Sequence, residues 1–140
     1  MRALLFSTSP EITTPHEFSI TLLRVFSGLT MALAHGLGKV PPPDQLIQGV
    51  GAMGFPMPVF FAWLAGLSEL LCGILLAIGL LTRPAAFFLS ITMLVAAFIA
   101  HGSDPFSVRE HSLLYLVIFL FFFMRGSGRW SVDHTISRGN

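Results

Sequence analysis

Four stretches of the chain are almost continuously apolar, and each is long enough to be considered as a membrane-crossing helix. A spanning helix needs about 20 mainly apolar residues, and the candidates cover 18–38, 58–81, 84–101 and 110–124, the last being the shortest. Only Thr82 and Arg83 separate the second stretch from the third, so we expect a tight antiparallel hairpin there. The pattern predicts an all-α fold, an integral membrane four-helix bundle.

The connection between the first two spans contains a further helical pattern. It opens with three prolines, Pro41, Pro42 and Pro43, and Asp44 follows as the expected N-cap. Over 45–53 the apolar residues gather on one side of a helical projection. We therefore predict a short interfacial helix that lies over the bundle between the first and second spans.

Basic residues divide unequally between the two sides of this bundle. One side has only Lys39 and Arg109, whereas the other has Arg2, Arg83, Arg125, Arg129 and Arg138. Because cytoplasmic loops carry the excess of Lys and Arg, we predict cytoplasmic N- and C-termini in a multi-pass protein of the cell inner (plasma) membrane. The predicted organisation is a cytoplasmic N-terminal segment (1–17), a membrane domain (18–124) and a cytoplasmic tail (125–140). The N-terminal segment is too polar for a cleaved signal peptide.

The composition narrows the possible functions. Of the 140 residues, 54% are hydrophobic and 11% are charged, whereas soluble domains have roughly 25% charged residues. Lipid is therefore expected to cover most of the surface. The formal net charge of +1 leaves no basic surface for a phosphate backbone, which excludes nucleic acid as a partner. A single cysteine, Cys72, excludes an internal disulfide and a cysteine-built metal or iron–sulfur site.

Two charged residues, Arg24 and Glu69, fall inside the predicted spans, where a charge is costly and usually faces the bundle interior. In an ideal helix Arg24 shares a stripe with His35 and Lys39, and small residues on both stripes permit close helix approach. We therefore expect Arg24 and Glu69 to face each other. Two interpretations stay open: an ion pair that locks the first two helices, or a Glu69 that acts as proton acceptor or ligand-binding carboxylate.

A second group of polar residues lies at helix ends. His35 and His101 end the first and third spans and Glu110 begins the fourth, so we expect all three at one level on the non-cytoplasmic side. Such a group could hold a transition metal, relay protons or contact a quinone headgroup, or pack as ordinary helix ends; we assign no metal. Tyr115, the only tyrosine, lies about one and a half turns into the fourth span as a core aromatic or a ligand contact.

Several sequence features follow one another along most of the chain. They are R-V-F-S-G-L-T-M-A-L-A-H-G-L-G-K (24–39), G-F-P-M-P (54–58), E-L-L-C-G-I-L-L-A-I-G-L-L-T-R-P-A-A (69–86), His101, E-H-S-L-L-Y-L (110–116) and G-S-G-R-W-S-V-D (126–133). In this order and spacing they resemble the DoxX family of small four-span membrane proteins. The closing motif differs from the family's G-P-G-like turn. The resemblance implies a four-helix membrane bundle and, for some members, a subunit of a quinone-linked enzyme such as thiosulfate:quinone oxidoreductase.

Residues and resemblance together leave three functions open. The first is a quinone-interacting subunit of a membrane redox system, with Glu69, His35 and His101 as catalytic candidates and the isoprenoid tail between helices. The candidate quinone-binding set is Arg24, His35, Glu69, His101, Glu110 and Tyr115. No haem, flavin or iron–sulfur pattern is visible, so a protein partner would have to deliver electrons. The second function is a non-enzymatic scaffold for a partner protein or a second copy, and the third is small-solute transport.

Overall fold

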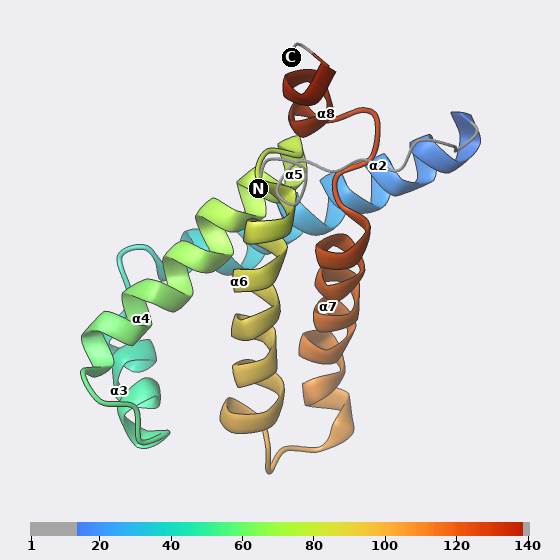
Figure 1. Ribbon diagram of the computed structural model, residues 1–140. Coiled ribbons are helices and arrows are strands. Elements are labelled where there is room, and N and C mark those ends of the chain that lie inside the picture. The colour runs from blue at the N-terminus through green and yellow to red at the C-terminus, as the bar shows by residue number, and fades with distance from the viewer. Residues whose placement is uncertain (1–13, 139–140) are drawn as a thin grey trace.

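The computed structural model describes residues 14–138, and these residues form helices and connecting turns without a strand (Figure 1). The α-helices are α2 (Thr14–Thr30), α3 (Asp44–Ala52), α4 (Pro58–Leu67), α5 (Gly73–Ile78), α6 (Thr82–Val95), α7 (Phe106–Arg125) and α8 (Val132–Arg138). Three π-helical turns, η1 (Met31–Gly36), η3 (Ser68–Cys72) and η4 (Ala96–Ala100), and one 3₁₀ turn, η2 (Leu37–Lys39), continue α2, α4 and α6.

Four continuous helices are long and apolar enough to cross a membrane, as the sequence predicts. They cover Thr14–Lys39, Pro58–Ile78, Thr82–Ala100 and Phe106–Arg125. The prediction of a short fourth span is wrong, because that helix has 20 residues and begins directly after Pro105. The first helix includes residues 14–17, which we assigned to the N-terminal segment, and residues 1–13 lie outside the described part of the chain.

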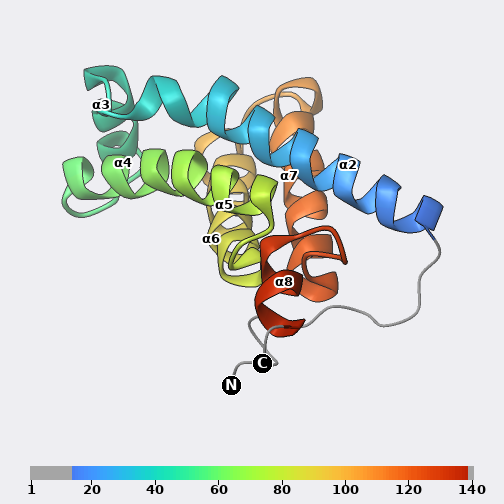
Figure 2. The ribbon, with the colours of Figure 1, turned by 90° about the horizontal axis from the view of Figure 1, so that it is seen from above.

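The spans pack as two pairs. Helices α6 and α7 lie side by side, while α2 lies against the rod formed by α4, η3 and α5 (Figure 2). The two pairs cross at a large angle, so that α6 and α7 stand upright in Figure 1 while α4 leans away from them. The buried apolar core lies where the pairs meet, with Met31, Leu76, Leu89, Phe119 and Phe122 among its members.

Glycines set the close approach of the first two spans. A Cβ added to Gly28 would lie 2.6 Å from the carbonyl oxygen of Gly73, and one added to Gly36 would lie 2.5 Å from the nitrogen of Leu70. Both distances are too short for any side chain, so the two backbones touch directly. This confirms the expectation that small residues on the two stripes allow the helices to pack closely.

The hairpin between the second and third spans also forms, with slightly different helix ends. Helix α5 ends at Ile78 because Gly79 has a φ of +72°, the left-handed conformation that commonly terminates helices. Leu81 is also left-handed, with a φ of +50°, and α6 begins at Thr82. The turn therefore lies at residues 79–81, just before Thr82 and Arg83, where we predicted it.

The predicted interfacial helix is present as α3, but its N-terminus is built differently from the prediction. Asp44 is the first helical residue and makes no side-chain cap; Pro43 precedes the helix, and its carbonyl accepts hydrogen bonds from the amides of Leu46 and Ile47. A carboxylate in the first turn still interacts favourably with the helix dipole. The predicted tail over 125–140 likewise contains a helix, α8, which the sequence pattern did not indicate.

Candidate functional site

Glu69 pairs with Lys39. The ammonium nitrogen of Lys39 donates hydrogen bonds to both carboxylate oxygens, at 2.7 and 2.6 Å. Glu69 lies on η3 and is only 3% exposed, whereas Lys39, at the end of the first span, is 32% exposed. The expectation that Arg24 and Glu69 face each other is therefore wrong, and the ion pair forms at the other end of the first helix.

The π-helical turn η1 explains why the stripe argument fails for His35. An α-helix has about 3.6 residues per turn, whereas a π turn holds more, because its amides bond to the fifth residue back. After Met31–Gly36 the helix is therefore rotated relative to an ideal continuation of α2. Gly36 and Lys39 face the second span, while His35 is exposed.

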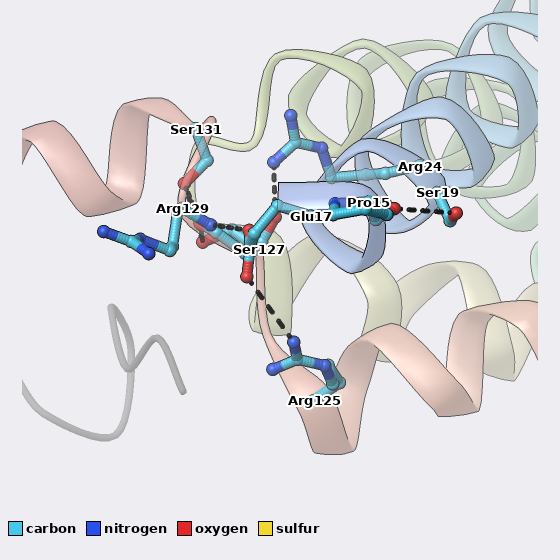
Figure 3. Close-up of polar contacts among 9 residues, drawn as sticks. Pro15, Glu17, Ser19, Arg24, Arg125, Ser127, Arg129 and Ser131 are labelled. Atoms are coloured by element: carbon cyan, nitrogen blue, oxygen red, sulfur yellow. Dashed lines mark hydrogen bonds and ion pairs between the residues drawn. The ribbon is translucent and has the colours of Figure 1, made fainter. Parts of the chain in front are cut away.

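Arg24 instead holds the C-terminal segment to the first helix. Its side chain is 2% exposed and donates to the carbonyl oxygens of Ser127 and Trp130, at 2.6 and 2.8 Å. Figure 3 shows Glu17, about two turns earlier on the same face of α2, bonded to the same segment: its carboxylate accepts from the amide of Arg129 at 2.5 Å. These contacts make Arg24 a structural residue that is distinct from the Glu69 site.

Asp133 completes this attachment. Its two carboxylate oxygens accept hydrogen bonds from the amides of Leu81 and Thr82, at 2.8 and 3.0 Å, and its own amide donates to Gly79. The carboxylate thus caps the N-terminus of α6 from a position 51 residues later in the chain. The G-S-G-R-W-S-V-D motif therefore ties both the first helix and the α5–α6 turn together, a role that we did not assign to it.

The Lys39–Glu69 pair faces a cavity of about 410 Å³. The walls come from α3, from α4 and η3, and from α6 and η4, so the cavity occupies the region where α4 and α6 diverge in Figure 1. Its polar lining consists of Lys39, Glu69, Thr92 and His101, and the remaining lining is apolar: Leu46, Val50, Met53, Phe55, Phe61, Leu64, Ala65, Ile91, Val95, Ala96 and Ala100.

All three π turns adjoin this site. Segment η3 carries Glu69, η4 lines the opposite wall and ends beside His101, and η1 leads through η2 to Lys39. The hydroxyl of Thr92 on α6 donates to that of Ser68 on η3 at 3.0 Å, which fixes the backbone next to Glu69. Single π turns occur frequently at functional sites, and here they aim the charged groups into the cavity.

His101 lies at the mouth of the cavity. Its Nδ1 is 2.8 Å from a carboxylate oxygen of Asp104, and both side chains are well exposed, at 44% and 42%. The imidazole therefore lies between the cavity and an exposed carboxylate. His101 and Glu69, both predicted, therefore do line one cavity.

The other predicted residues lie elsewhere. The imidazole of His35 contacts the ring of Tyr115 edge to face, with centroids 5.8 Å apart, and Tyr115 stacks on Phe119. Glu110 is exposed on α7, and among the described residues none of His35, Tyr115 and Glu110 lines the cavity. Within 14–138, no three His, Cys, Asp or Glu side chains are grouped to hold a metal ion.

Sequence reasoning missed Lys39 as a site residue. We expected Arg24, on the same ideal stripe, to be the cation that faces Glu69. Lys39 entered the sequence analysis only as a basic residue at the end of the first span. The available signal was its spacing: Lys39 lies one turn after Gly36, on the buried side that the glycines mark. A buried carboxylate and an ammonium facing an apolar cavity offer one acceptor and one donor to the polar end of an amphipathic ligand.

Comparisons with known proteins agree with this architecture. A model of the DoxX family matches residues 19–102. An uncharacterized membrane protein of Mycobacterium tuberculosis is 35% identical over 135 residues, which cover 86% of this chain and 82% of the relative. An uncharacterized Haemophilus influenzae protein is 38% identical over 112 residues, 74% of this chain and 81% of the relative. The Bacillus subtilis protein CatD, whose name describes it provisionally as an oxidoreductase, is 29% identical over 124 residues, which cover 88% of this chain and 90% of the relative. No solved structure gives a significant match.

Proposed function

Because the chain belongs to the DoxX family of membrane proteins, we propose that it is a quinone-interacting subunit of a membrane redox system. The observation that carries the proposal is the Lys39–Glu69 pair, a charged donor and acceptor facing a largely apolar cavity between membrane-spanning helices. A volume of about 410 Å³ falls within the range of about 300–1,000 Å³ found for small-ligand sites.

The cavity lining suits the two ends of a quinone. Lys39 donates a hydrogen bond to one quinone carbonyl oxygen, and Glu69 delivers a proton to the same oxygen on reduction or accepts it when the quinol is oxidised. The isoprenoid tail leaves past Leu64 and Ile91, which are each 46% exposed on the lipid-facing side of the cavity wall. His35, which we had included in the headgroup site, has no part in this arrangement because it packs on Tyr115.

Reduction of a quinone to a quinol takes two electrons and two protons. The protons enter through His101, whose imidazole connects the cavity to Asp104. The electrons come from a redox centre on a protein partner, and the provisional name of CatD as an oxidoreductase supports such an assignment. In the proposed topology both termini are cytoplasmic and the membrane is the inner one, so His101 opens to the opposite side.

Native mass spectrometry on the full chain, extracted gently from its own membranes, tests the proposal. We expect one quinone for each chain, and a loss of at least about tenfold in affinity when Glu69→Gln or Lys39→Met removes one charged group. His35→Ala is the matched control, because it removes a polar ring outside the cavity. Folding of each variant is checked by thermal unfolding in detergent.

Two results would overturn the quinone assignment. One is a partner chain bound at full occupancy without quinone, which would make the protein a membrane scaffold. The other is unchanged quinone binding in both Glu69→Gln and Lys39→Met, which would place the quinone elsewhere on the protein.

A further inference from the structure

A second, smaller pocket lies at the opposite end of the bundle from His101. Its volume is about 240 Å³, and it is lined by Thr14, Glu17, Arg129, Trp130, His134 and Arg138. Thr14 and Glu17 belong to the first turn of the first span, and Arg129 and Trp130 lie in the connection between the end of the fourth span at Arg125 and α8. The ends of membrane-spanning helices lie at the level of the lipid headgroups, so the pocket lies at that depth.

An aromatic pair marks the side of the pocket that faces lipid. Trp130 is 49% exposed and Phe18 is 56% exposed, and their rings meet edge to face with centroids 6.5 Å apart. Trp is enriched at membrane–water interfaces, where its apolar ring contacts the acyl chains and its N–H meets the headgroups. A molecule in this pocket can therefore extend an apolar chain past Trp130 into the bilayer.

The electrostatics of the pocket favour an anion. Among the described residues that line the pocket, Glu17 alone carries a carboxylate. This group is 2% exposed, accepts from the Arg129 amide and lies 3.8 Å from the guanidinium of Arg125. Between residues 14 and 138, the guanidinium groups of Arg129 and Arg138 have no ion-pair partner. Figure 3 shows the Arg129 side chain directed away from Glu17, so its charge remains available.

We infer that this pocket binds the phosphate of an anionic phospholipid, between the guanidinium groups of Arg129 and Arg138. Guanidinium matches phosphate in a bidentate geometry that other cations do not provide. A zwitterionic choline lipid is disfavoured, because its own ammonium group would lie among these cations. A lipid fits better than a free phosphate, because the pocket lies at headgroup depth with Trp130 on its lipid side. The inference is independent of quinone binding.

Fluorescence of Trp130 reports occupancy directly. The chain has two tryptophans, Trp63 and Trp130, so Trp63→Phe leaves the pocket residue as the only tryptophan, which is excited selectively. The full-length protein is placed in phosphatidylcholine vesicles that contain a small fraction of lipid with brominated acyl chains, which quench a neighbouring indole. We expect brominated phosphatidylglycerol to quench Trp130 several-fold more strongly than brominated phosphatidylcholine at the same fraction.

Charge variants separate the pocket from general attraction to the surface. Arg129→Gln and Arg138→Gln each remove one of the two guanidinium groups that would face the bound phosphate, and the loss of a charge-assisted contact in place of a neutral one should reduce the preference by about fivefold. Arg83→Gln is the matched control, because it removes one charge at the same end of the bundle, outside the pocket lining. It should leave the preference unchanged.

Three results would overturn the inference. Equal quenching of Trp130 by the two brominated lipids, in the protein that carries only the Trp63→Phe change, would show that the pocket does not prefer an anionic lipid. An equal loss of the preference for phosphatidylglycerol in Arg83→Gln and Arg129→Gln would mean that the preference comes from the overall charge of this surface and not from the pocket. Suppression of the preference by inorganic phosphate, at constant ionic strength, would assign the pocket to a free phosphate and not to a lipid.

Discussion

Lys39 and Glu69 come from different membrane spans, and the single ammonium group of Lys39 reaches both oxygens of the Glu69 carboxylate, at 2.7 and 2.6 Å. The pair is asymmetric, because the carboxylate is 3% exposed and the lysine 32%. Its position on a largely apolar cavity means that a ligand can exchange hydrogen bonds with both groups without leaving either charge uncompensated.

The first prediction concerns the stability of this pair. Lys39→Met leaves the Glu69 carboxylate buried without a partner, which should lower the free energy of unfolding by about 1–3 kcal/mol. Combining it with Glu69→Gln should recover part of that loss, because no charge then remains buried. The measurement is unfolding of the two single variants and the double variant in detergent. Strict additivity of the two substitutions would contradict the pairing.

The second prediction concerns proton entry through His101. His101→Ala should slow the reduction of bound quinone by a chemical reductant by about 10²-fold, and added imidazole should restore much of the rate. The reductant supplies both electrons, so only the delivery of protons changes. His111→Ala is the control, because His111 is exposed and lies outside the cavity lining. If quinone binds normally and reduction is equally fast in both variants, His101 is not the proton route, although the binding site itself would stand.

The third prediction tests the contact between the first two spans. Gly36→Ala places a methyl group 2.5 Å from the Leu70 nitrogen, and overpacking of this kind should cost about 1–3 kcal/mol of stability. Gly38→Ala adds the same methyl group two residues away, where nothing lies within 4 Å, so it should be neutral. Thermal unfolding of the two variants compares them directly. Equal unfolding temperatures of the two variants would mean that the first two spans can move apart at Gly36 without loss of stability.

The fourth prediction concerns the C-terminal segment. Asp133→Asn replaces one of the two acceptor oxygens by an NH2 group, so the amide of Leu81 or of Thr82 loses its acceptor, which should destabilise the protein by about 1–2 kcal/mol. Asp44→Asn is the matched control, because Asp44 makes no side-chain cap. Quinone affinity should remain unchanged in both variants. A large loss of quinone affinity in a folded Asp133→Asn protein would contradict the conclusion that the C-terminal attachment and the quinone site are independent of each other.

Much of the architecture could be predicted from the sequence, because membrane spans need long apolar runs that are visible residue by residue. The four spans, the hairpin after Gly79 and the helix after Pro43 all follow from hydropathy and from Pro or Gly punctuation. The π turns could not be predicted in this way, since nothing in M-A-L-A-H-G distinguishes a π turn from an α turn.

One error in the candidate site has that physical origin. The turn at Met31–Gly36 takes His35 off the buried stripe, while Lys39 stays on the buried side and pairs with Glu69. Arg24 was misassigned for a different reason: its partners, the carbonyls of Ser127 and Trp130, lie in a segment that looks like a polar tail. Backbone carbonyls carry no sequence signal, so such an attachment becomes visible only in the fold.

The central claim is that a quinone headgroup occupies the cavity beside Lys39 and Glu69. Its most direct test is photolabelling of the membrane-embedded full chain with an azidoquinone, followed by mapping of the labelled peptides. We predict label on η3 and on the facing part of α6 and η4, removed by excess unmodified quinone and strongly reduced in Glu69→Gln but not in His35→Ala. Label confined to α7 around Tyr115, or label that excess quinone does not displace, would contradict the account.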